Sequence, residues 1–257
     1  MAELSSTAGP ASLQRESYWQ ESRGPLASLL FMTPLLLLYE GGVLIFGSGG
    51  VRNGADAWLR SLLDMLGFSG YFLLPVLTVG MLLAWHHTTR KPWRVRGWVL
   101  SGMLVESSIL GLILVGIAHL QGELFAPFLS AGMSNEFSCT TVAVGGSVGR
   151  TVAKLVGFFG AGFYEEVLFR LLLLPVVAVL LGAAGFSPRK RAWGAIAITS
   201  LIFSAAHYIG PYGDVLQVYT FTFRFMAGVL FALLFVYRGF GIAAGTHALY
   251  DIFVGLQ

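Results

Sequence analysis

Charged residues are scarce in this chain. They make up 11% of its 257 residues, whereas a soluble globular domain carries about 25%, so the composition excludes an ordinary soluble domain. The net charge is +3, but the basic residues lie in short connections rather than in one basic surface, which excludes a nucleic-acid-binding protein. Cysteine is almost absent as well, because Cys139 is alone, and an internal disulfide is therefore excluded.

Hydrophobic residues, in contrast, make up 56% of the chain and gather in long runs. A run of about 17 to 25 apolar residues is long enough to cross a bilayer as a helix. The runs are 26–47, 70–86, 98–119, 150–186, 193–210, 218–237 and 240–256. We therefore expect an all-α, polytopic transmembrane helical bundle with about seven spans, or eight if the long fourth run breaks near Gly160 and Gly162.

Lysine and arginine in the connections indicate the orientation of the chain. Most of them lie in the polar N-terminal tail, 1–24, and in loops 87–97 and 187–192, which fall on one side of a seven-span bundle. Basic loops stay cytoplasmic, so we expect a cytoplasmic N-terminus in the inner membrane of a prokaryote. The tail shows no cleaved signal peptide. Because no internal repeat is found, residues 25–257 are expected to form a single integral-membrane domain.

Two connections have features of their own. Segment 51–68 has leucines on one helical face and Arg52, Arg60 and Asp64 on the other, which predicts an amphipathic helix on the membrane surface. Segment 121–149 contains glycine, serine, threonine and proline, and this composition predicts an external loop.

Ionisable side chains inside the later apolar runs indicate a functional site. Such groups are costly in lipid, and they usually line a hydrated cavity or pair with one another. The stretch 160–174 holds Glu165, Glu166 and Arg170. Residues four apart share a helical face, so the pattern predicts an ion pair between Glu166 and Arg170 and leaves Glu165 free for another task.

Two further pairs have the same spacing, Phe203 with His207 and His247 with Asp251. The first spacing lets the phenyl ring pack beneath the imidazole, and the second places both polar groups on one helical face. Counted along the spans, Glu165, His207 and Asp251 lie in the same half of the membrane. A shared cavity is therefore geometrically possible.

Two histidines and several carboxylates in one hydrated cavity suit hydrolysis of an amide bond. A carboxylate near a histidine can take a proton from water, and a second histidine can stabilise the oxyanion that forms. A non-enzymatic membrane transporter, a proton relay or a scaffold or immunity protein would also carry such residues. Arg224, in the sixth run, is expected to pair with a site carboxylate.

Zinc-protease motifs of the His-Glu-x-x-His type, or their inverted form, do not occur in the sequence. We therefore expect neither a metal nor a cofactor. His207, His247 and the carboxylates are nevertheless residue types that bind zinc, so a metal held without such a motif stays open as an alternative.

Three motifs near the C-terminus resemble those of a known family. They are Glu165-Glu166-x-x-x-Arg170, Phe203-x-x-x-His207 and His247-x-x-x-Asp251. In this order they are similar to the motifs of the CAAX prenyl protease 2 and bacteriocin-processing family, also called CPBP or Abi, whose members are intramembrane glutamic endopeptidases. The resemblance covers about 160–255. It implies that Glu165 and His207 activate the attacking water.

The same resemblance implies an oxyanion site formed by His247 and Asp251, supported by Glu166 and Arg170. The family usually has asparagine where this chain has Asp251. Because an ionised aspartate would repel an oxyanion, we expect Asp251 to be a neutral acid or to orient His247. The implied partner is a protein or peptide substrate within or at the lipid bilayer, and the sequence marks neither its identity nor an oligomeric state.

Overall fold

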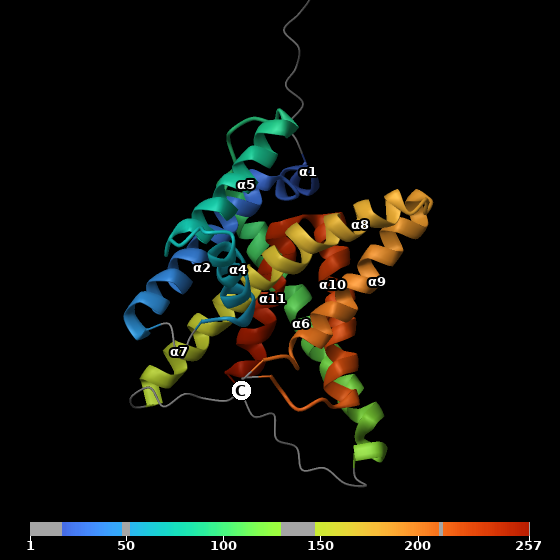
Figure 1. Cartoon of the computed structure of the whole chain (residues 1–257). Helices are drawn as coiled ribbons and strands as arrows, with labels where there is room; N and C mark the ends of the chain where they lie inside the picture. Colours follow the sequence, from blue (N-terminus) through green and yellow to red (C-terminus); the bar gives the residue numbers. More distant parts are fainter. Residues whose placement is uncertain (1–16, 48–51, 130–146, 211–212, 257) are drawn as a thin grey trace, which may run out of the picture.

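A computed structural model of the chain describes residues 17–47, 52–129, 147–210 and 213–256. The described residues form helices and no strand, which confirms the all-α prediction (Figure 1). The helices are α1 (Tyr18–Ser22), α2 (Pro25–Phe46), α4 (Gly54–Met65), α5 (Leu73–Thr89), α6 (Gly97–Leu129), α7 (Ser147–Gly160), η1 (Ala161–Glu165), η2 (Val167–Leu173), α8 (Leu174–Ala183), α9 (Pro188–Ala206), α10 (Val218–Arg238) and α11 (Phe240–Gly255).

Each predicted apolar run coincides with a helix or with one continuous set of helices. Four stretches are long and apolar enough to cross a membrane, namely Pro25–Phe46, Gly97–Ala126, Val148–Ala183 and Val218–Arg238. The chain is therefore an integral membrane protein. The count of seven spans stays a prediction, because α5, α9 and α11 are shorter or less apolar than these four.

α11 runs through the middle of the bundle, where it contacts α2, α6, α7, α10 and η1 (Figure 1). Every residue from 240 to 248 is buried. Glycine permits the close approach of its neighbours, because a Cβ on Gly241 would lie 2.8 Å from Cα of Ser28, and one on Gly162 would lie 2.7 Å from the backbone nitrogen of Ala248. Small residues let membrane helices meet at such distances, so η1 is fixed directly against α11.

The long fourth run forms one continuous helix from α7 to α8, with no break at Gly160 or Gly162. Its backbone changes winding instead, because η1 and η2 are π-helical on either side of Glu166. π-Helical turns are rare and often occur at functional sites. The change of winding begins directly after Gly160, close to where the sequence indicated an interruption.

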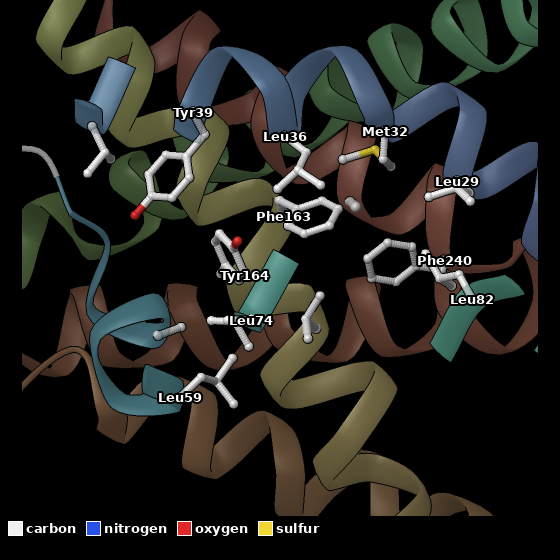
Figure 2. Packing of buried hydrophobic residues seen from close by; sticks show 14 of the residues in the cluster. Leu29, Met32, Leu36, Tyr39, Leu59, Leu74, Leu82, Phe163, Tyr164 and Phe240 are labelled. Atoms are coloured by element: carbon white, nitrogen blue, oxygen red, sulfur yellow. The ribbon is translucent and has the colours of Figure 1, made fainter. Parts of the chain in front are cut away.

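An apolar cluster between α2, α4, α5, η1 and α11 holds η1 in place (Figure 2). Phe163 and Phe240 are fully buried and meet edge to face, with ring centroids 5.9 Å apart. Tyr39 and Tyr164 meet in the same manner at 5.4 Å. Such aromatic pairs contribute about 0.5–1.5 kcal/mol beyond their burial. Two of these rings belong to the residues just before Glu165, so the cluster fixes the position of that residue.

The predicted amphipathic helix forms as α4, but Asp56 and Arg60 are turned into the protein. Asp56 is fully buried, and Arg60 donates to it at 2.5 Å. Burial alone would lower the pKa of Arg60, but the carboxylates of Asp56 and Glu40 outweigh burial and hold that pKa above its usual value. Trp58 and Leu62 are exposed on the opposite face. The prediction of a helix is confirmed. The expected outward placement of its charges is wrong for Arg60, which faces Asp56 and Glu40, and holds for Asp64, which is exposed.

The segment 121–149, predicted to be an external loop, is in part helical. α6 continues to Leu129, and α7 begins at Ser147. The prediction is wrong at its first end because apolar residues, among them Leu124 and Phe125, follow Gly122 and Glu123 and continue α6. Residues 130–146, with Cys139, lie outside the described residues.

One end of the bundle is held by ion pairs that include the predicted polar tail. Arg238 donates to both carboxylate oxygens of Glu106 at 2.6 and 2.7 Å and lies 4.0 Å from the ring centroid of Trp19. Arg96 donates to Glu21 at 2.6 Å. The tail, the loop before α6 and the end of α10 therefore lie together, as a seven-span arrangement requires. The side of the membrane on which they lie stays a prediction.

Candidate active site

Glu165 ends η1 and faces both histidines of the predicted site. Its Oε2 lies 3.8 Å from Nε2 of His207 and 3.9 Å from Nε2 of His247. This oxygen is buried, and no group in the described part of the chain forms a hydrogen bond with it. Residues from three separate helical segments thus meet around one carboxylate oxygen that is free to accept a proton.

His207 follows the last residue of α9, and its ring is oriented by a backbone contact. Nδ1 lies 2.8 Å from the carbonyl oxygen of Phe203. Because a carbonyl can only accept, Nδ1 carries the proton, and in the neutral ring Nε2 presents a lone pair. The phenyl ring of Phe203 packs edge to face against the imidazole at 5.0 Å, as the four-residue spacing predicted. The lone pair on Nε2 is therefore directed toward Glu165.

His247 is held on all sides of its ring. Nδ1 lies 2.8 Å from Oε1 of Glu166, and Nε2 lies 3.7 Å from Oδ2 of Asp251. Phe231 stacks on the ring at 4.5 Å and 14°. A hydrogen bond on one ring nitrogen sets the protonation of the other. Glu166 therefore orients His247 so that Nε2 faces Glu165 and Asp251.

The predicted ion pair between Glu166 and Arg170 is confirmed. Nη1 of Arg170 lies 3.0 Å from Oε1 of Glu166, and both side chains are almost fully buried. Arg170 also donates to the carbonyl of Gly228 at 3.2 Å, and its guanidinium lies 4.4 Å from the ring centroid of Phe203. Arg170 therefore links Glu166, and through it His247, to the aromatic ring under His207.

Arg224 does not pair with a site carboxylate, so that prediction is wrong. Its guanidinium forms an ion pair with Asp214, in the connection between α9 and α10, and lies 5.1 Å from the ring centroid of Tyr208. Arg224 is near the start of α10, where an acidic side chain of the preceding connection is within reach. The ion pair thus holds the segment that follows His207.

Sequence reasoning missed Asn53, which contacts the predicted catalytic carboxylate. Nδ2 of Asn53 donates to Oε1 of Glu165 at 2.9 Å. The sequence offered one signal. Asn53 directly precedes the first helical residue, Gly54, and Asp56 lies in the first turn, which is typical of a helix N-cap. Such a pattern indicates where a helix begins, but it carries no information about a contact with a distant helix.

A cleft of about 440 Å³ opens between the C-terminal half of α6 and the neighbouring ends of α10 and α11. Its wall includes Phe223 and Tyr250, whose rings lie 5.6 Å apart, and Tyr250 directly precedes Asp251. The complete lining is Val115, Ala118, His119, Gly122, Glu123, Ala126, Tyr219, Thr220, Phe223, Arg224, Tyr250 and Val254. The cleft is therefore mostly apolar and lies on the helix that carries His247 and Asp251.

A comparison with known protein families gives a match for the part of the chain that contains Glu165, His207 and His247. Residues 147–253 match the family model described as type II CAAX prenyl endopeptidase Rce1-like. No curated protein and no solved structure matches the chain. The matched residues run from α7 to α11 and include both histidines, both adjacent glutamates and Asp251. Residues 147–253, less than half of the chain, are therefore similar to the type II CAAX prenyl endopeptidases of the Rce1-like family.

Proposed function

We propose that the chain is an intramembrane endopeptidase that hydrolyses a peptide bond in a membrane-associated protein or C-terminal tail. The observation that carries the proposal is the unbonded Oε2 of Glu165, which lies 3.8 Å from His207 and 3.9 Å from His247. The match of residues 147–253 to a model of prenyl endopeptidases supports hydrolysis. The geometry supports Glu165 as the group that accepts the proton.

In the proposed first step, one water molecule contacts Oε2 of Glu165 and Nε2 of His207. Both atoms present lone pairs to it, because Nδ1 of His207 donates to a carbonyl. Glu165 takes one proton as the water oxygen attacks the carbonyl carbon of the scissile peptide. The protonated carboxyl then returns this proton to the departing amine, so that water is consumed and two chain ends are formed.

In the proposed oxyanion site, His247 donates a hydrogen bond through Nε2. Its Nδ1 already donates to Glu166, so the ring must carry both protons to donate a second time. The carboxylates of Glu165 and Glu166 lie beside the ring as counter-ions. A fixed donor aimed at the developing charge is worth about 10²–10³-fold in kcat.

The cleft between α6, α10 and α11 suits the apolar part of the substrate. Its lining joins aliphatic side chains with the rings of Phe223 and Tyr250. Binding sites of this kind are concave and mostly apolar, with a few polar groups that orient the ligand. We therefore place the membrane-embedded segment of the substrate there, beside the helix that carries His247.

A comparison of protein C-termini across the proteome tests the proposed function. Cells with the wild-type chain and cells with Glu165→Ala would be analysed by mass spectrometry of C-terminal peptides. We expect a small set of membrane proteins to lose their C-terminal residues in wild-type cells alone. Identical termini in both strains would contradict peptidase action and would favour a transporter or scaffold role.

Asp251→Asn tests the departure of this chain from the usual family motif. We expect the variant to retain most of its activity, because an amide keeps the shape of the side chain and can donate a hydrogen bond. Asp251→Leu should lower kcat by about 10²-fold or more, as loss of an oxyanion donor does. Equal rates of peptide cleavage by the two variants would show that Asp251 serves neither His247 nor the oxyanion.

Exhaustive chelation is expected to leave the activity unchanged. Within the described ranges, no three histidine, cysteine or acidic side chains are arranged to hold a metal ion, and the proposed base already lies beside His207. Cleavage rates would be measured before and after dialysis against chelators, with added zinc as the matched condition. Loss of activity that zinc restores would replace the proposed mechanism with a metal-dependent one.

A further inference from the structure

Asn53 uses both polar groups of its side chain and its backbone N–H to connect three parts of the described structure. Its Oδ1 accepts from the backbone N–H of Ala55 at 2.8 Å, which caps the N-terminus of α4. Its backbone N–H donates to the hydroxyl of Tyr39 at 2.9 Å. Its Nδ2 donates to Oε1 of Glu165 at 2.9 Å. The side chain is thus held at both ends, between a helix terminus and the proposed catalytic carboxylate.

An asparagine suits this position because its amide both donates and accepts. The N–H of Ala55 requires an oxygen, so the amide nitrogen must be the atom that faces Glu165. Serine or aspartate could cap the helix equally well. Serine is too short to bridge to Glu165, and a carboxylate would place a like charge beside it.

Hydrogen bonds of Asp56 and Arg60 hold α4 against its neighbours, and they therefore also fix the position of Asn53 at its N-terminus. Buried Asp56 accepts from the Tyr39 hydroxyl at 2.8 Å and from Arg60 at 2.5 Å. Arg60 also donates to Glu40 at 3.0 Å. Glu40 in turn accepts from the hydroxyl of Tyr164, the residue before Glu165. The rings of Tyr39 and Tyr164 lie together in the cluster drawn in Figure 2.

These hydrogen bonds connect α2 and α4 to two adjacent residues of η1. Tyr164 is held through Glu40, and Glu165 is held through Asn53. With Oε1 occupied by Asn53, Oε2 is the oxygen left facing His207 and His247. Groups held by fixed supports keep a reacting atom in its productive geometry.

We infer that Asn53 is a positioning residue, which lies outside the family-matched residues and fixes the Glu165 carboxylate so that Oε2 faces the two histidines. This inference rests on the proposed function for its effect on rate. The contact between Asn53 and Glu165 can be tested without any activity.

The kinetic test uses variants that keep the helix cap and remove the donor. Asn53→Ser should lower the unfolding midpoint only slightly, through loss of the contact with Glu165, and should lower kcat for the cleaved peptide about 10- to 100-fold, with KM nearly unchanged. Asn53→Asp should lose more activity than Asn53→Ser, because the added carboxylate faces Glu165. Asn53→Ala, which removes the cap as well, should lower the midpoint further than Asn53→Ser. Full activity of Asn53→Ser would show that Asn53 only caps α4 and would overturn the inference.

A thermal double-mutant cycle separates this inference from the proposed function. The midpoints of wild type, Asn53→Ser, Glu165→Ala and the double variant would be measured in the same detergent. We expect the double variant to lose less than the sum of the single losses, because both changes remove one contact. Additive losses would overturn the inference even in an active peptidase. A wild type that cleaves no more than Glu165→Ala would overturn the proposed function, while the cycle would still decide whether Asn53 holds Glu165.

Discussion

Replacing Glu165 with glutamine is expected to lower kcat by about 10²–10⁴-fold, the usual contribution of a general base. Glutamine has nearly the same shape and can still accept from Asn53 through its amide oxygen. It cannot take a proton from water beside His207. KM and the unfolding midpoint should therefore stay near those of the wild type, and initial rates of peptide cleavage in lipid vesicles would measure the change.

Asp64→Asn provides the matched control for this substitution. It makes the same exchange of a carboxyl for an amide at an exposed position of α4. We expect wild-type rates from this variant. Wild-type cleavage by Glu165→Gln would show that another group activates the water, and the proposed assignment of Glu165 would be wrong.

The largest expected loss of stability follows from Arg170→Met. Arg170 is almost fully buried between Glu166, the carbonyl of Gly228 and the ring of Phe203. Removal of one member of a buried ion pair leaves the other charge uncompensated and costs about 3–5 kcal/mol. We expect the free energy of unfolding to fall by this amount, measured by denaturant unfolding in detergent micelles. His247 should lose its orientation at the same time, because Glu166 holds its Nδ1.

Two comparisons distinguish this loss from a general effect of removing a cation. Arg189→Met changes an exposed arginine at the start of α9 and should leave the free energy of unfolding nearly unchanged. Adding Glu166→Gln to Arg170→Met should restore part of the lost stability, because the stranded charge is removed. If Arg170→Met were as stable as Arg189→Met, the buried pair would not hold the core of the site.

Contacts within a single helix could be predicted from the sequence, because periodicity alone determines them. The pairing of Glu166 with Arg170 and the packing of Phe203 against His207 both follow from a four-residue spacing. The all-α fold followed from the length of the apolar runs. The prediction that residues of different helices meet in one site rested on the motif resemblance and on their depth in the membrane. These two arguments indicate a region of the bundle, but they do not predict any particular contact.

Contacts between distant segments could not be predicted from local patterns. Asn53 contacts a residue 112 positions away, and its local pattern indicated a helix cap alone. The polar face of α4 could not be oriented, because an amphipathic pattern is the same whether charges face water or the buried carboxylate of Glu40. Arg224 found its partner in a connection, where no periodicity applies. The π-helical winding of η1 has no distinct apolar spacing over so few residues.

Water-dependent cleavage by the purified chain tests the proposed mechanism most directly. The wild type, Glu165→Gln and His207→Ala would be reconstituted in lipid vesicles with a peptide that contains the cleaved bond, in water enriched in heavy oxygen. Mass spectrometry should show a heavy oxygen atom in the new carboxyl group for the wild type, and little or no product for the two variants. Absence of cleavage by the wild type, or equal product from Glu165→Gln, would contradict a glutamate-activated water at this site.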